Sequence, residues 1–359
     1  MSSRSTTART VPSRRAILAS SAMTGVLALA ACGPKDAVPT IPAQPSGASA
    51  GPAADRERIS AVVADIAEAL RGADAKKDPK KLAPRIVGTA ALARTRAYQI
   101  MAKVPGYAPA QLSPTSSVIV PLTSTGETFP RVAIALVDDK AGGGQRDFVA
   151  LTQKDARSPY TTWGWALQSA GVKKLPTVQP DSIGAAPVPY DASDLVLSPK
   201  AALARYAAVL SYGAAADKEK LIVTDPFQEA AHKGIQNERA DLNKGVAPDS
   251  LATVHEDYTV VGPAEYIGIR SSDGGAIVMA SMRSKRTMKT VGNATITVKD
   301  TDASGKPFAE VKLTGKTTFT KEFVRDYSEV VVLWIPKKGS GEKIQPFAAT
   351  KSLLAASGS

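Results

Sequence analysis

The segment 55-DRERISAVVADIAEALRGADAKKD-78 marks the start of the folded part of this 359-residue chain. Its large apolar residues recur at i, i+3, i+4, i+7 and i+11, the spacing of one face of a helix: Ile59, Val62, Val63, Ile66 and Leu70. Asp55 is placed to cap this helix. Asp78, followed by Pro79, opens a second helical stretch that we expect to reach about Lys103, with a break near Gly88.

Further along, the apolar period falls to two, which is typical of strands. In the first half we expect strands at 117–122, 131–137, 146–153 and 161–168. After a connector rich in Pro and Asp, residues 175–194, Ser198-Pro199 and Asp225-Pro226 each open a helix. Strands are then expected at 253–261, 266–270, 276–288, 294–299, 308–323 with an internal break, and 330–335. Two halves with helices before strands indicate an α+β fold and an internal duplication.

The N-terminus has the features of a signal peptide, residues 1–31. It contains four Arg and no acidic residue, and it ends in an uncharged run from Ala16 to Ala31. The end of this run and the next residue, Leu29-Ala30-Ala31-Cys32, resemble the lipobox of bacterial lipoproteins. The resemblance implies cleavage between Ala31 and Cys32, a diacylglyceryl group on the Cys32 thiol, and an acyl chain such as palmitate on the new terminus. The alternatives are a signal peptide with a chance Cys and a buried core thiol.

Two adjacent arginines bear on the export route. Arg14 and Arg15 lie in the segment 13-SRRAIL-18, which resembles the twin-arginine export signal, with Ile17 where that family usually has Phe. The alternative is an ordinary secretory signal with two neighbouring arginines. Both routes lead out of the cytoplasm.

Residues 32–54 are interpreted as the lipidated Cys and a disordered tether, because five Pro alternate with Gly, Ala and Ser. A diacylglyceryl group would hold the protein at the cell membrane, on the extracytoplasmic face, without a transmembrane helix. From Cys32 on, the chain has a formal charge of +8. This charge favours anionic neighbours such as envelope polymers or lipid headgroups. We expect no nucleic-acid partner, and no protein partner is indicated.

Helices followed by a curved antiparallel sheet, at this domain size, resemble the NTF2-like cone. In that fold the helices cover the concave face of the sheet and leave a pocket at the wide end. The resemblance implies two tandem NTF2-like domains, residues 55–190 and 191–359. With the lipobox, the whole chain resembles lipoproteins of high-GC Gram-positive bacteria that carry such domains and have no assigned activity.

The composition offers little for catalysis. One Cys and two His leave no disulfide framework and almost nothing for a zinc or heme site, so we expect no metal and no cofactor. The segment Asp300–Gly305 begins like a calcium loop, but Glu310 falls one position short of the closing ligand, which favours a polar turn. His255, Glu256 and Asp257 are acid/base candidates without a nearby nucleophile, and we interpret them as solvated strand-end residues. We name no catalytic residue.

The segment 282-MRSKRTMK-289 is a candidate anion-binding strand. Because side chains alternate along a strand, Arg283, Lys285 and Lys289 share one face and Arg286 lies opposite. The alternative is a solvated outer sheet face. Elsewhere, Trp163 and Trp165 are expected on one strand face, where they fill the core or line a cavity.

These patterns together predict a non-enzymatic binding or scaffolding lipoprotein of the cell envelope. One alternative is a carrier of a small hydrophobic or lipid-like ligand, which requires a deep apolar cavity. Another is an enzyme, which two facing carboxylates or a His-carboxylate pair deep inside a cone would favour.

Overall fold

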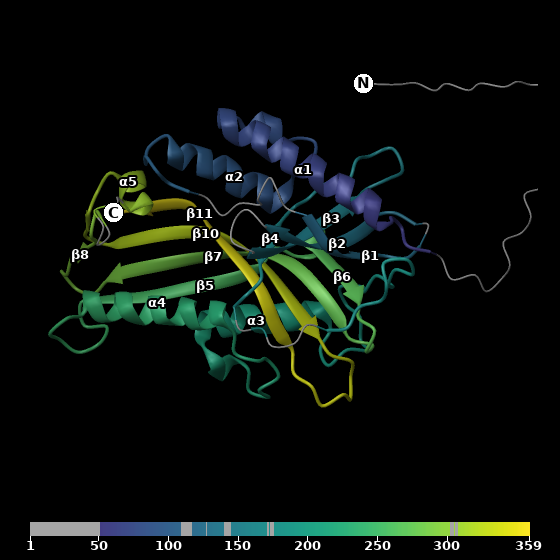
Figure 1. The fold of residues 1–359 in the computed structure, drawn as a ribbon. Coiled ribbons are helices and arrows are strands. Elements are labelled where there is room, and N and C mark those ends of the chain that lie inside the picture. Colours follow the sequence, from purple (N-terminus) through teal and green to yellow (C-terminus); the bar gives the residue numbers. More distant parts are fainter. Residues whose placement is uncertain are drawn as a thin grey trace, which may run out of the picture. The chain divides into compact units, whose positions relative to one another are not determined.

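The computed structural model describes residues 51–108, 117–126, 128–139, 145–170, 172, 176–301, 305 and 308–359, and they belong to one compact unit (Figure 1). They form an α+β fold in which helices pack on antiparallel sheets, and this confirms the expected class. None of the helices in these ranges combines the length and the apolarity that crossing a bilayer requires.

The first half contains helices followed by a four-stranded sheet of order β1-β2-β3-β4. Its elements are α1 (Arg56–Lys76), the 3-10 helix η1 (Pro79–Leu82), α2 (Gly88–Met101), β1 (Ser117–Thr123), β2 (Arg131–Asp139), β3 (Gln145–Gln153) and β4 (Trp165–Leu167). The expected apolar stripe of α1 is buried against alternate residues of β2 and β3. Asp55 caps α1 as predicted, because its carboxylate accepts a hydrogen bond from the Arg58 amide at 2.7 Å.

The second half repeats this order with longer strands. Its elements are α3 (Pro199–Tyr212), η2 (Ala214–Ala216), α4 (Pro226–Leu242), β5 (Ala252–Val260), η3 (Pro263–Glu265), β6 (Tyr266–Arg270), β7 (Ala276–Thr290), β8 (Ile296–Thr297), α5 (Ala309–Thr314), β9 (Thr318–Phe319), β10 (Glu322–Ile335) and β11 (Gln345–Gly358). The main sheet has the order β11-β10-β7-β5, and β6 pairs with the first part of β7. Ser198 and Asp225 cap α3 and α4, as predicted.

One expected strand is wrong. The sequence predicted a strand over 308–323, but Ala309–Thr314 form α5 and β10 begins only at Glu322. Gly315 ends the helix at φ 67°, a conformation that suits glycine, and its amide donates to the Val311 carbonyl at 2.9 Å. Ala309 and Leu313 pack with Ile100 near the end of α2. This packing across the chain favoured the helix over the local period of two.

The two sheets pack on each other through one apolar cluster. Ile134 of β2 lies in the same cluster as Ile277 of β7 and Trp334 of β10. The opposite face of the second sheet, with Val278 and Leu333, packs on α3. Figure 1 accordingly shows α1 and α2 on one side of the sheets and α3 and α4 on the other. The two expected domains share this cluster, and their boundary near residue 190 stays a prediction.

A side chain of the second half caps a helix of the first. The N-cap residue of α2, Val87, has no capping side chain, but the Thr89 amide donates to Glu265 Oε1 at 3.0 Å. Gly88, at φ 53°, leaves room for this carboxylate, with which a β-carbon would collide. A carboxylate at a helix N-terminus is favourable, so Glu265 stabilises α2 and joins the two halves.

Candidate functional site

The face of the second sheet that packs on α3 and α4 changes character along the strands. Its first apolar part ends near Met282, the next inward positions on β7 are Ser284 and Arg286, and a second apolar cluster begins at Met288. Helix α4 and strand β11 add one charged side chain each. We call the seven residues the charged cluster: Glu238, Glu256, Ser284, Arg286, Arg325, Glu329 and Lys351.

Glu256 of β5 lies at the centre of the charged cluster with a fully buried side chain. Its Oε2 accepts from Arg286 Nε at 2.8 Å and from Arg286 Nη2 at 2.7 Å, and its Oε1 contacts Lys351 Nζ. Burial acts to raise the pKa of the Glu256 carboxyl, but Lys351 and Arg286 outweigh burial and lower it to about 2. Glu256 is therefore ionised at neutral pH.

Glu329 of β10 faces Glu256 across a shared hydroxyl. Ser284 Oγ lies 2.6 Å from Glu256 Oε1 and 2.6 Å from Glu329 Oε1. A hydroxyl has one hydrogen, so it donates to only one of two carboxylates, and the other must bring its own proton. Burial raises the pKa of Glu329 to about 7, which places that proton on Glu329. Glu329 thus donates to Ser284, and Ser284 donates to Glu256.

The outer part of the charged cluster lies under α4. Glu238 accepts from Arg325 Nη1 at 2.8 Å and Nη2 at 2.7 Å, and from Arg286 Nη1 at 3.2 Å. The Arg286 guanidinium lies against Gly234, whose position would place a β-carbon 3.3 Å from Nη1. This close approach accounts for a glycine inside a helix, where it costs about 1 kcal/mol relative to Ala.

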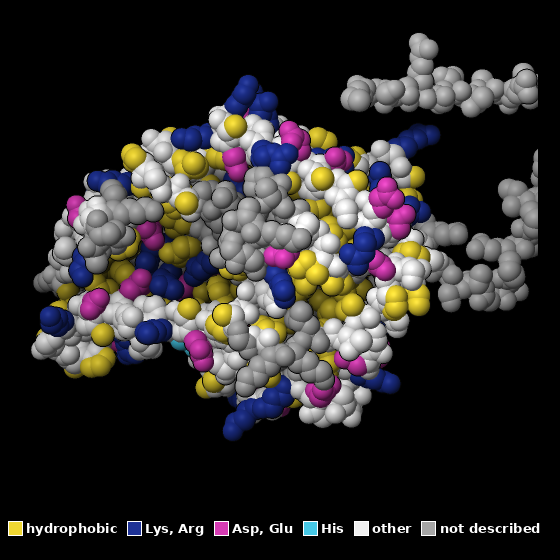
Figure 2. Space-filling view, in the orientation of Figure 1, with side chains coloured by type: hydrophobic (Ala, Val, Ile, Leu, Met, Phe, Trp, Pro, Cys, Tyr) yellow, Lys and Arg dark blue, Asp and Glu magenta, His cyan; other side chains and the backbone are white. Residues whose placement is uncertain are grey.

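The charged cluster reaches the surface in part. The Glu238 and Lys351 side chains are 24% and 21% exposed, whereas Glu256 and Glu329 are fully buried. Figure 2 shows a hollow between α4 and α5 with Lys or Arg side chains on its floor. Three cations face three carboxyl groups, so the cluster carries +1 while Glu329 is protonated. Because Lys351 is partly exposed and Glu329 is fully buried, a polar ligand that approaches the charged cluster would meet the cation before the buried carboxyl group.

The raised pKa of Glu329 gives a testable pH dependence. Its usual pKa is 4.5, so between pH 4.5 and about 7 the folded chain holds a proton that the unfolded chain has lost. The contribution of this proton to the free energy of unfolding is fully present below pH 4.5. It falls by about 1.4 kcal/mol per pH unit as pH rises toward 7. Urea unfolding of the native chain and of Glu329→Gln at pH 5 to 8 measures this effect. The free energy of unfolding of the native chain should fall relative to that of the variant as pH rises to 7, and the difference should stay constant above pH 7. A constant difference across this range would contradict the assignment.

Of the three acid/base candidates, only Glu256 lies inside. His255 and Asp257 point outward, with the His255 Nε2 nitrogen 2.9 Å from Asp257 Oδ1, and Tyr212 stacks on the imidazole. His255 is partly exposed and Asp257 is exposed, as interpreted, whereas Glu256 is buried, so the interpretation is wrong for Glu256. The expected place at a strand end is wrong for all three, because they lie in the middle of β5. Alternation along β5 explains the difference, because Glu256 shares the inward face with Val254 and Tyr258.

In the candidate anion-binding face, other groups of the protein lie beside the basic side chains and compete with an anion for them. Arg286 does lie opposite Arg283, Lys285 and Lys289, as expected. However, Arg283 Nη1 donates to Thr89 Oγ1 at 2.9 Å, which occupies part of that guanidinium. In the strand register, Lys285 lies between Asp257 and Asp326, and Lys289 lies beside Glu322. Anion binding by these three residues stays a prediction.

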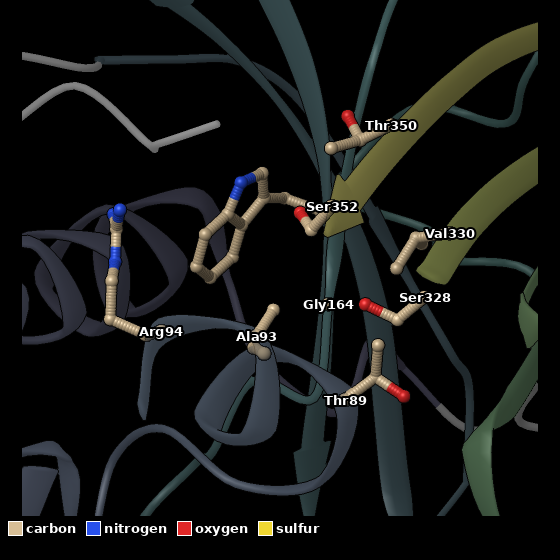
Figure 3. A pocket seen from close by; sticks show the side chains of 10 residues that line it. Thr89, Ala93, Arg94, Gly164, Ser328, Val330, Thr350 and Ser352 are labelled. Atoms are coloured by element: carbon tan, nitrogen blue, oxygen red, sulfur yellow. The ribbon is translucent and has the colours of Figure 1, made fainter. Parts of the chain in front are cut away.

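Trp163 and Trp165 are both buried, and this confirms the expectation that they fill the core. They belong to different apolar clusters, because β4 begins only at Trp165, so the expected shared face is wrong. Trp165 also lines a pocket of about 20 Å³, room for about one water molecule. Figure 3 shows Arg94 on one side of this pocket and Ser328 on the other.

Several predicted site residues lie outside the described residues: Arg14, Arg15, Leu29, Ala30, Ala31 and Cys32, together with Asp302 to Ser304 of the calcium-like loop. Among the side chains that are described, no group of three or more His, Cys, Asp or Glu is placed to hold a metal ion.

Sequence reasoning missed most of the charged cluster. The sequence did contain one signal, the alternation of side chains along the strand. It puts Ser284 and Arg286 on the same face as Met282, which is the buried face. On α4, Glu238 follows Ile235 at i+3 on the buried side of the helix.

No protein-family model, curated protein or solved structure matches this chain.

Proposed function

We propose that this protein is a lipid-anchored, extracytoplasmic envelope protein that acts by binding, with its ligand site at the charged cluster. The lipobox at Leu29–Cys32 and the tether up to residue 54 support the anchor and the location. We further propose that each half is an NTF2-like cone. The repeated order of helices and then antiparallel strands supports this assignment.

The observation that carries the binding role is the charged cluster in its hollow. In the first half, the space between the helices and the sheet is filled by an apolar cluster that includes Ile66 and Val149. In the second half, the corresponding space contains two apolar clusters and also charged groups, and two of these, Glu238 and Lys351, are partly exposed. The charges are paired with one another, but a buried set of ion pairs is often no more stable than apolar residues of similar volume, so a contribution to stability alone does not account for it. The cluster therefore supports a role in ligand binding.

The carrier alternative gains no support from the pocket beside Trp165 or from a larger cavity at the end of α3, because neither is a deep apolar one. The enzyme alternative is favoured by one observation, the two facing carboxyl groups of Glu256 and Glu329. A carboxyl group that is neutral near pH 7 beside an ionised one is a typical acid/base pair. In that case Glu329 would be the proton donor and Glu256 its electrostatic partner.

Photocrosslinking in intact cells tests the binding role. A photoreactive amino acid is placed at Glu310 of α5, which lies close enough to Tyr327 of β10 to influence its ionisation. Tyr327 in turn lies beneath Lys351, with Nζ 4.2 Å from the ring centre. We expect a specific adduct at position 310 and none at Lys81, an exposed residue of η1.

The same adduct should disappear in Lys351→Gln, which removes the partly exposed cation but leaves Arg286 to pair with Glu256. Equal adducts at positions 310 and 81, or an adduct that survives Lys351→Gln, would argue against binding at the charged cluster. Mass spectrometry of the captured molecule separates the two functions: an unaltered ligand supports binding, and a converted one supports the enzyme.

A further inference from the structure

A second cavity, of about 470 Å³, lies at the C-terminal end of α3, apart from the charged cluster. The loop after α3, the start of α4 and the loop before β11 form its walls. Three lysines line it, Lys218, Lys220 and Lys343, and we call it the lysine cavity. Its other lining includes the apolar Val209 and Ile222 and the hydroxyl of Thr224.

The lysines of this cavity have no counter-ions among the described residues. None of the three forms an ion pair there. The one carboxylate in the lining, Asp217, is occupied: it pairs with Arg205 at 3.3 Å and accepts from the Ile222 amide at 2.7 Å. The neighbouring Glu219 is paired with Arg205, so no described carboxylate forms an ion pair with these three exposed lysines.

We propose that the lysine cavity binds a phosphate ester. A phosphate monoester carries a charge of about −1.5 to −2 near pH 7, which needs more than one cation, and lysine binds phosphate as a point charge. The volume lies in the range of small-molecule sites, roughly 300 to 1,000 Å³. Val209 and Ile222 offer an apolar wall for the carbon skeleton. The inference goes beyond the proposed function and does not depend on the lipid anchor or on the charged cluster.

Binding measurements on the full chain carrying Cys32→Ser, which prevents lipid attachment, test the inference. The probes are glycerol 3-phosphate in solution, and phosphatidylcholine vesicles with and without phosphatidic acid, the lipid whose headgroup is a phosphate monoester. We expect the triple variant Lys218→Gln, Lys220→Gln and Lys343→Gln to weaken binding of the phosphate probe at least tenfold. The matched control replaces three exposed lysines of the first half, Lys76, Lys80 and Lys81, by Gln and should change binding less than twofold.

The two probes distinguish the source of the phosphate. A selective loss for glycerol 3-phosphate alone supports a soluble ester, and a selective loss for vesicles with phosphatidic acid supports a lipid headgroup. Equal weakening by both triple variants would show general charge attraction and overturn the proposal, as would the absence of saturable binding to either probe.

Discussion

Replacing Glu256 by Leu should destabilise the protein by about 3 to 5 kcal/mol, because it leaves Arg286 and Lys351 as buried cations without their central partner. Ser284 also loses the acceptor for its hydroxyl. Chemical unfolding at pH 7.5 measures the change. At this pH Glu256, whose pKa is held at about 2, is fully ionised in the native chain.

The neighbouring Asp257→Leu is the matched control, since Asp257 lies on the same strand but is 57% exposed. Its loss should cost no more than about 1 kcal/mol, as for other exposed ion pairs. If Glu256→Leu does not fold, Glu256→Gln keeps the side-chain shape and should still cost more than Asp257→Gln. Equal effects at the two positions would mean that the charged cluster contributes little to the fold.

Replacing Cys32 by Ser should move nearly all of the protein out of the membrane fraction or leave an unprocessed precursor. The physical reason is that a diacylglyceryl thioether requires a thiol, and a buried acyl chain contributes about 0.8 kcal/mol per CH₂ to membrane binding. Fractionation of cells, with immunodetection of the protein, measures the effect.

The control for this experiment moves the thiol without removing it. In the double variant Cys32→Ser and Ser46→Cys, the thiol lies in the expected tether, outside the lipobox, and anchoring should not return. If Cys32→Ser fractionates like the native chain, the protein is held at the membrane by something other than a lipid on Cys32.

Local signals predicted the helices well. Asp55, Ser198 and Asp225 each cap a helix because a side-chain oxygen next to the first turn needs no distant partner to act. The stripe from Ile59 to Leu70 is buried because a period of 3.6 residues fixes one face. For α5 the local pattern was insufficient, since its burial depends on Ile100, more than 200 residues earlier in the chain.

The charged cluster is a second feature that local sequence patterns could not predict, because its residues are far apart in the chain. Its members come from five elements, and no spacing in the sequence relates Glu238 to Arg325 or Glu256 to Lys351. The run 255-HED-257 looks solvated because all three residues are polar. The alternation of Val254, Glu256 and Tyr258 puts the middle residue on the inward face, and the pairing of β5 with β7 places Arg286 beside it.

The central claim, a lipid-anchored extracytoplasmic protein, is tested most directly by the mass of its mature N-terminus. Protein extracted from membranes is digested with trypsin, and the peptide that begins at Cys32 and ends at Lys35 is measured. We predict a mass increased by a diacylglyceryl group, with or without one further acyl chain. A peptide that still contains Ala31 before Cys32, or one with a free thiol, would contradict the claim.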